Sequence, residues 1–448
     1  MTDASFTPRS TTDVARSTTE DPHHRWDVVV VGSGLAGLTS AATARRAGAA
    51  VALVEGPAPG GRARTEDRDG FLLNLGPHAV YDGGPGRRVL ERLGVPLDGA
   101  RPPATTTLGW QDRTARLPQG PGAVVSRFLG PVDKVRLVRA AARVLRTDPA
   151  SVAHLTVDEW LAGLLPERPR AVLAALVRVG TYTADLDLLS ADVAVTQLKV
   201  AAKRVTYLHG GWAQLTGGLR AAGVGVEVVP GSATSVEHDA DGPVVRTAAG
   251  TVRGRRVVLA AGSPAAVGGL LPDGPPASWG RLGPAVTVSC LDLALHQPPT
   301  VPSWFGVDRP HYLVAHAPGA RLAPEGRSLV HAMRNLHHRE TASAAELRAD
   351  LDALARRAGI AEDDVVFARY LHRMVVVSAS VTPTGGGLAG RPAPTDTGLD
   401  DVLVAGDWVG PTGWLADASL VSGETAGRLA AEGARAAAAT GRVSAEAS

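Results

Sequence analysis

The stretch from Trp26 to Glu55, WDVVVVGSGLAGLTSAATARRAGAAVALVE, constrains the fold more than any other part of the chain. An uninterrupted apolar run is followed by glycines, by a helix-forming stretch with small residues, and by a second apolar run, which is the order of a βαβ unit. A strand that is apolar on both faces is typical of a parallel sheet covered on both sides. The sequence therefore predicts an α/β fold with a doubly wound parallel sheet.

The glycines between this strand and its helix follow a spaced pattern. Gly32, Gly34 and Gly37 form G-x-G-x-x-G. The first glycine permits the tight turn, the second lets the backbone approach a pyrophosphate, and the third lets the helix pack closely on the strand. Glu55 ends the second strand 18 residues after Gly37, where a carboxylate accepts hydrogen bonds from ribose hydroxyls. This context predicts a site for an adenine dinucleotide.

The next residues bear on which dinucleotide binds. EGPAPGGRART contains a second glycine pair, ending in Gly61, followed by Arg62 and Arg64. Glycines and arginines placed there suit a ligand that continues past its phosphates into the protein. FAD fits that description better than NAD.

With the Gly-Asp pair Gly406 and Asp407 near the C-terminus, these motifs resemble those of the FAD-dependent amine oxidase, protoporphyrinogen oxidase and phytoene desaturase superfamily. The resemblance implies that Asp407 holds the ribityl–phosphate side of FAD and that Ala233, in VPGSATSV, lies beside the adenine. The single cysteine, Cys290, is far in sequence from every one of these motifs. We therefore expect FAD to be bound non-covalently.

Near the C-terminus, GPTGWLADASLVSG places Trp414 and Leu415 before Asp417. Asp417 can cap the helix that follows. The resemblance directs the start of that helix toward the pyrimidine end of the flavin, where a positive helix end favours the anionic reduced ring. Trp414 and Asp417 are thus candidate catalytic residues, Asp417 alternatively as an acid–base group, and Leu415 is a candidate flavin contact.

The segment GPHAVYDGG, from Gly76 to Gly84, is a further candidate. By resemblance it passes close to the flavin ring, and Gly76 would let the backbone approach the isoalloxazine. His78 is then the first titratable side chain near the reacting carbon, a proton donor or acceptor with a pKa near neutrality. The alternative is an imidazole that only lines the cavity, and Tyr81 is expected to pack.

The resemblance implies an oxidoreductase in which the cofactor carries the chemistry and the protein positions the substrate. Amine-oxidising members use a lysine near the flavin and an aromatic cage; neither is evident here, since none of the lysines follows residue 270. NLGPHAVYDGG and HRMVVVSASVTPTGGGLAGRP look more like the phytoene desaturase-like branch. We expect oxidation of a CH–CH unit in an apolar small molecule. Amine oxidation, flavin-dependent isomerisation or saturation of a double bond, and a flavoprotein that only binds a ligand are the alternatives.

The elements alternate along the chain in a way that predicts two interwoven domains. Residues 1–25 are polar, rich in Ser and Thr, and lack the apolar core of a secretory signal, so we expect a flexible leader. Strand-like runs and glycine turns assign 26–100, 205–272 and 390–440 to a discontinuous FAD-binding domain. Helical spacing and a second group of strands assign 101–204 and 273–389 to an α+β substrate domain.

Charge and hydropathy limit the partners. The 43 arginines and three lysines are mixed with 44 acidic residues, so no nucleic-acid partner is expected. No apolar run is long enough to cross a membrane. The single cysteine, Cys290, rules out an internal disulfide and fits a reducing compartment, so we expect a cytoplasmic protein. The adjacent histidines His337 and His338 would point to opposite faces of a strand, so no metal site is expected.

One helical stretch, DKVRLVRAAARVLRT, has two interpretations. Val135, Val138, Ala142 and Leu145 form an apolar stripe beside a stripe of arginines. An ordinary amphipathic helix would pack its apolar stripe on the core and expose the arginines. An interfacial helix would instead bring the protein into peripheral contact with the inner membrane face.

Overall fold

The computed structural model describes residues 24–111, 113–118 and 129–446, so the expected leader lies almost wholly outside the described residues. Its parallel sheet combines strands from three separate stretches of the chain. The parallel strands are, in spatial order, β10 (Glu227–Pro230), β2 (Val51–Glu55), β1 (Trp26–Val31), β13 (Gly250–Leu259) and β19 (Val402–Val404).

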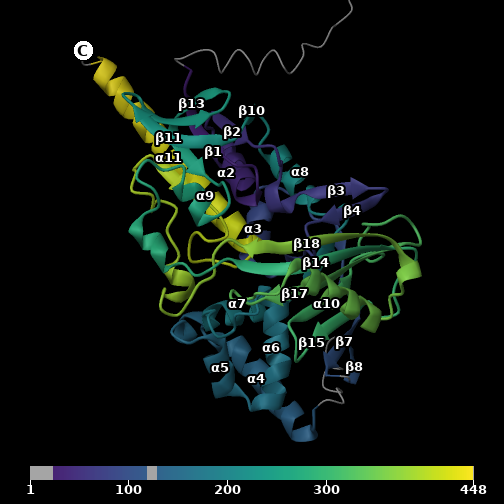
Figure 1. Ribbon diagram of the computed structural model, residues 1–448. Coiled ribbons are helices and arrows are strands. Elements are labelled where there is room, and N and C mark those ends of the chain that lie inside the picture. The colour runs from purple at the N-terminus through teal and green to yellow at the C-terminus, as the bar shows by residue number, and fades with distance from the viewer. Residues whose placement is uncertain (1–23, 112, 119–128, 447–448) are drawn as a thin grey trace, which may run out of the picture.

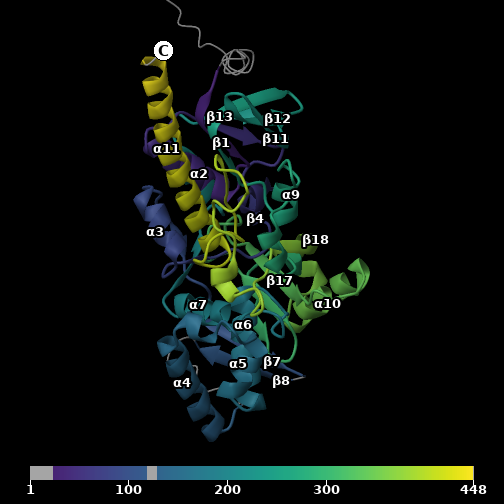
Figure 2. The same cartoon turned by 90° about the vertical axis from the view of Figure 1, so that its left-hand side faces the viewer.

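Both faces of this sheet are covered, as the apolar run in β1 predicts. Val28 and Val30 face helices, whereas Val29 and Val31 face the opposite layer. The helices on the first face are α2 (Leu35–Arg46), α3 (Pro85–Arg92), α8 (Ala213–Ala222) and α11 (Ala416–Glu446). Figure 2 shows α11, in yellow, running alongside α2. The α/β class predicted from the sequence is confirmed.

The second face of the parallel sheet is covered differently from a regular doubly wound domain. An antiparallel pair, β11 (Ala233–Asp239) and β12 (Gly242–Thr247), continues from the first half of β13. This pair and the short helix α9 (Pro264–Gly268) bury Val236, Val245 and Val267 against the sheet. Strands therefore supply much of the layer that helices would otherwise form.

A second, mostly antiparallel sheet lies below the first in Figure 1. Its strands, in spatial order, are β18 (Val365–Val377), β14 (Val286–Leu295), β17 (Ser328–Leu336), β16 (His311–Ala315), β15 (Ser303–Gly306), β7 (Thr105–Trp110) and β8 (Arg113–Pro118). Leucines on one face of β14 pack against α10 (Ala344–Arg357). Val288 and Cys290, on the other face, pack toward the parallel-sheet domain.

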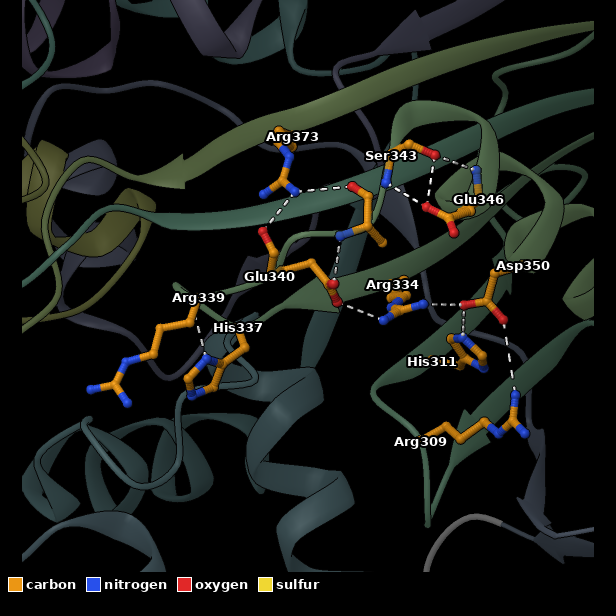
Figure 3. A network of polar contacts seen from close by, with 11 residues as sticks. Arg309, His311, Arg334, His337, Arg339, Glu340, Ser343, Glu346, Asp350 and Arg373 are labelled. Atoms are coloured by element: carbon orange, nitrogen blue, oxygen red, sulfur yellow. Dashed lines mark hydrogen bonds and ion pairs between the residues drawn. The ribbon is translucent and has the colours of Figure 1, made fainter.

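Polar contacts fix α10 to this sheet (Figure 3). Arg334 of β17 donates to Asp350 of α10 at 2.9 Å and to Glu340 at 2.6 Å. His311 of β16 bonds the same Asp350 carboxylate at 2.7 Å. Burial raises the pKa of Asp350, but the His311 hydrogen bond and the Arg334 charge outweigh it and lower that pKa to about 2.

Four helices form a layer at the lower end of the molecule in Figures 1 and 2. They are α4 (Pro131–Arg146), α5 (Val157–Leu164), α6 (Glu167–Thr181) and α7 (Ala191–Ala201). Thr156 and Glu159 form a capping box at the start of α5. Small sheets, β3 (Thr65–Arg68) with β4 (Phe71–Asn74), and β5 (Val80–Tyr81), β9 (Val205–Leu208) and β6 (Gly99–Ala100), complete the fold. The domain boundaries stay a prediction.

Candidate functional site

A cavity of about 590 Å³ runs between the two sheets. At one end it is lined by the glycine loop after β1, and at the other by Met333 of β17 and Met374 of β18. Ligand sites in open α/β sheets lie beyond the carboxyl ends of the parallel strands, which is where this cavity begins. The cavity therefore joins the expected dinucleotide site to the second domain.

Two glycines of the loop, Gly34 and Gly37, serve different purposes. A Cβ at Gly37 would overlap the carbonyl oxygen of Gly32, so Gly37 permits close packing of α2 on its own turn. A Cβ at Gly34 would meet no atom within 4 Å, because Gly34 borders the cavity. Gly34 is also the N-cap of α2 and has no side chain to cap it. The helix start thus presents backbone N–H groups to the cavity, which fits a pyrophosphate.

Glu55 ends β2 as predicted, but the structure gives it a partner that the sequence did not suggest. Its carboxylate receives a hydrogen bond from Arg220 of α8, 165 residues away. Among the described residues, Gly56 lines the cavity but its neighbour Glu55 does not. Glu55 and Arg220 therefore lie at the edge of the site as an ion pair.

Arg62 and Asp407 meet at the centre of the site. Arg62 donates to the Oδ2 atom of Asp407 at 2.9 Å and to the carbonyl oxygen of Val376 at 2.8 Å. The other carboxylate oxygen of Asp407, Oδ1, is buried without a hydrogen-bond partner among the described residues. A buried oxygen that accepts nothing is costly, so this atom fits a hydroxyl donor on a bound ligand.

Other residues predicted to hold the cofactor also line the cavity. A Cβ added at Gly61 would lie 3.6 Å from the Cα atom of Gly34. Gly61, Ala233 and Gly406 all contribute to the cavity wall. Leu415 lines it with a φ of 55°, a left-handed conformation that is unusual for a non-glycine residue. Strained backbone of this kind is often found at functional sites.

The surroundings of Gly76 explain why a glycine stands there, and its predicted contact with the flavin stays a prediction. Gly76 has a φ of 78°, which favours glycine, but it is absent from the described cavity lining. A Cβ there would lie 2.9 Å from Cε of Met374 and 3.5 Å from Sγ of Cys290. The glycine thus makes room for Met374 and for the buried Cys290.

His78 lines the cavity, but the prediction of a pKa near neutrality is wrong. Burial lowers the pKa of His78 to about 4, so the imidazole is neutral at pH 7. Its Nδ1 atom lies 3.0 Å from the carbonyl oxygen of Gly76, and its ring packs edge-on against Trp212 at 4.3 Å between centroids. A carbonyl only accepts, so Nδ1 carries the proton and Nε2 is left as an acceptor.

Trp414 is 1% exposed and forms part of the cavity wall. Its indole N–H donates to the carbonyl oxygen of Thr181 at 3.1 Å. The indole hydrogen is therefore used to hold the ring in place, and the ring itself is what Trp414 offers to a ligand.

Asp417 does not cap its own helix, contrary to expectation. It lies inside the first turn of α11, and its Oδ1 atom accepts a hydrogen bond from the backbone N–H of Gly86 at 3.0 Å. Burial raises the pKa of Asp417 to about 7, and its Oδ2 atom has no hydrogen-bond partner within the part of the chain that the structure describes. Asp417, not His78, is the cavity residue that titrates near neutrality.

The sequence analysis did not identify Tyr182 and Trp212 as lining residues, and it expected Tyr81 only to pack. All three join Trp414 in giving the cavity four aromatic side chains. Tyr182, at the end of α6, has a φ of 61° and its hydroxyl lies 3.4 Å from the carbonyl oxygen of Pro77. No local spacing signals this grouping, because the residues come from separate segments.

Two further groups of side chains contain donors that a cation can use. Asp185 contacts both His337 and His338, whose rings lie 4.4 Å apart, because β17 ends at Leu336 before the two histidines. Contrary to the prediction, the two histidines therefore do not lie on opposite faces of a strand. In the second group, His331 and Cys290 already contact Asp292. The prediction that the protein binds no metal is not tested by these contacts.

Comparison with known proteins supports this description. Residues 30–93 match the family of NAD(P)-binding Rossmann-like domains. Hydroxyneurosporene desaturase of Rhodobacter capsulatus is 33% identical over 150 residues, which cover 33% of this chain and 28% of that protein. The match thus spans little more than a quarter of the relative's length.

Two solved structures are similar over almost the whole chain. Cyclohexylamine oxidase from Brevibacterium oxydans IH-35A has a TM-score of 0.69 at 18% identity, with 91% of this chain and 99% of that one covered. A candidate protoporphyrinogen oxidase from Exiguobacterium sp. 255-15 has a TM-score of 0.66 at 16% identity, with 89% and 97% covered. The chain therefore has a Rossmann-like dinucleotide-binding domain and the fold shared by the superfamily that its motifs resemble.

Proposed function

We propose that this protein is an FAD-dependent oxidoreductase that takes a hydride from an apolar small molecule, by oxidation of a CH–CH unit to a double bond. The observation that carries the proposal is the continuous cavity. It begins at a glycine loop and uncapped helix start suited to a pyrophosphate, and ends among apolar side chains that include Leu75, Met333 and Met374. The partial match to a hydroxyneurosporene desaturase supports the same branch.

The residues present fit a flavin dinucleotide. The start of α2 and Gly34 would hold the pyrophosphate, Glu55 with Arg220 would meet the adenosine ribose, and the unpartnered Oδ1 of Asp407 would accept from the ribityl side. FAD, when bound, supplies the hydride acceptor. The protein's own part is to bind, orient and exclude water.

Several residues of this chain are placed to perform these tasks. The indole ring of Trp414, which is held by its hydrogen bond to Thr181, provides a fixed flat surface. The apolar end of the cavity can orient a substrate that carries no charged groups. The neutral imidazole of His78 keeps Nε2 as an acceptor. Asp417, with a pKa of about 7, is suited to take up or release a proton near neutral pH.

Amine oxidation is the second candidate, and a specific observation favours it. Tyr81, Tyr182, Trp212 and Trp414 line one cavity, and aromatic faces attract cations. The similarity to cyclohexylamine oxidase is compatible with that reading. Against it, the described cavity lining includes no lysine. Isomerisation and saturation of a double bond would use the same apolar cavity. Isomerisation would leave no net oxidised product, and saturation would require a reductant.

The deciding experiment begins with the absorption spectrum of the purified protein. A bound flavin should then be bleached anaerobically by a linear polyene with saturated CH–CH units, and the product should carry an additional double bond. Bleaching by primary amines alone would establish the second candidate. A polyene that is converted without a change in its oxidation state would indicate isomerisation. A protein that contains no flavin, and whose melting temperature does not respond to added FAD, would overturn the proposal.

A further inference from the structure

Helix α4 has apolar side chains on two sides, and the residues that the structure describes cover only one of them. Ala140 and Val144 are buried against the other helices of its layer, with Leu137 packed beside them. The predicted apolar stripe faces away from this contact. The ordinary amphipathic interpretation, in which that stripe packs on the core, is therefore wrong.

The outward stripe is unusual for this molecule. Its exposed side chains are Val132, Val135, Val138 and Leu145, at 63%, 51%, 52% and 55% exposure. They are four of the seven large apolar side chains exposed among the described residues. Single exposed apolar residues are normal, but a grouped set marks an interaction surface. Along the helix axis the stripe extends about 20 Å.

The charges around the stripe indicate the kind of partner. The helix carries a single acid, Asp133, which pairs with Arg136 at 3.1 Å. Its basic residues are Lys134, Arg136, Arg139, Arg143 and Arg146. Arginines beside an apolar stripe can bury their stems and keep their charges at the level of lipid headgroups.

We propose that α4 is an interfacial helix that docks this protein on an anionic lipid surface. Helix α4 lies at the lower end of the molecule in both views, where a flat surface can reach it (Figures 1 and 2). A second copy of the chain is a poorer occupant, because a symmetric contact would bring the basic residues of two α4 helices together. Within the described residues no helix is long and apolar enough to span a bilayer, so the contact proposed is peripheral.

Flotation of the full chain with lipid vesicles tests this proposal independently of the cofactor chemistry. Wild-type protein should float with phosphatidylcholine vesicles that contain a quarter phosphatidylglycerol, and salt should weaken the binding. The double variant Val135→Asp/Val138→Asp should reduce the bound fraction at least about tenfold, since it places two charges in the stripe. Both side chains are half exposed, so the melting temperature should stay unchanged.

A matched control uses exposed valines elsewhere. Val224→Asp/Val228→Asp changes residues at 76% and 38% exposure outside α4 and should float like the wild type. Wild-type protein that stays unbound, or an α4 variant that floats as well as the control, would overturn the proposal. So would equal flotation with vesicles of phosphatidylcholine alone. A dimer in solution that the α4 substitutions dissociate, without vesicle binding, would assign the stripe to self-association instead.

Discussion

The carboxylate of Asp417, on α11, caps helix α3 by accepting a hydrogen bond from the backbone N–H of Gly86 at 3.0 Å. A Cβ at Gly84 or Gly86 would overlap this carboxylate, so two glycines make room for it. The contact joins segments 331 residues apart at the wall of the cavity. The Oδ1 atom of Asp417 thus has a structural role, whereas its Oδ2 atom has no hydrogen-bond partner among the described residues.

Asp417 should make the stability of the cofactor-free protein depend on pH. Its folded-state pKa of about 7 lies above the ordinary value of 3.8, so its contribution is fully present below about pH 4 and is lost as pH rises through 7. The loss should amount to a few kcal/mol, because one pKa unit corresponds to about 1.4 kcal/mol. Asp417→Asn keeps an acceptor for Gly86, so its melting temperature should fall less than that of the wild type between pH 5 and 8. Parallel curves for the two proteins would contradict the assignment.

Two glycines of one loop should respond in opposite ways to substitution. Gly34→Val places its side chain in open space, at a φ of −70° that valine tolerates, so the protein should fold but should not bind FAD. Gly37→Ala drives a methyl group into the Gly32 carbonyl and should lower the melting temperature or prevent folding. Thermal melting with and without added FAD separates the two effects. An FAD-dependent increase in the melting temperature of Gly34→Val would show that the pyrophosphate lies elsewhere.

His78 should act as a neutral group. With a pKa of about 4, it should give no inflection in the rate of flavin reduction between pH 6 and 8. His78→Ala should retain FAD and slow reduction by substrate, since Nε2 is lost as an acceptor. Rapid-mixing measurements of flavin absorbance check both statements. Loss of FAD with unchanged chemistry in the reconstituted protein would assign His78 to packing alone.

A pH inflection near neutrality, if it affects flavin reduction, should come from Asp417. It should therefore disappear in Asp417→Asn and persist in His78→Ala. The same pH series, recorded on both variants, makes this comparison. The reverse pattern would restore the acid–base role originally expected for His78.

The contacts of Asp350 should stabilise the protein at moderate pH and fail in acid. Its pKa of about 2 lies below the ordinary 3.8, so its contribution is present above about pH 4 and is lost as pH falls through 2. Asp350→Asn should lower the free energy of unfolding at pH 7 by on the order of 1–2 kcal/mol, after allowance for partial exposure. Asp352→Asn, in a more exposed pair with Arg348, is the control and should cost less than about 0.5 kcal/mol. Equal losses in urea unfolding would contradict the importance of the α10 anchor.

The dinucleotide loop was predictable because its information is local. Gly32, Gly34 and Gly37 act on a single turn and on the helix that starts there, and their spacing is visible in the sequence. The pairing of Glu55 with Arg220 was not predictable, because nothing near Glu55 indicates which helix will approach it. The same holds for Trp414, whose partner Thr181 is 233 residues away.

The helix α4 shows the same division. Its periodicity predicts a helix correctly and reveals an apolar stripe, but the other side also carries apolar residues, Leu137 and Val144 among them. Which side faces the core depends on how α4 docks against α6 and α7. That choice leaves Val135 and Val138 exposed.

The α/β class and the dinucleotide loop could be predicted from the order of the amino acids, because both follow from patterns within about thirty residues. The side chains that titrate in the cavity could not be predicted in this way. His78 and Asp417 have ordinary pKa values as isolated residues, and burial shifts them in opposite directions because it disfavours whichever form carries the charge. That burial is produced by segments that meet only when the two sheets close around the cavity.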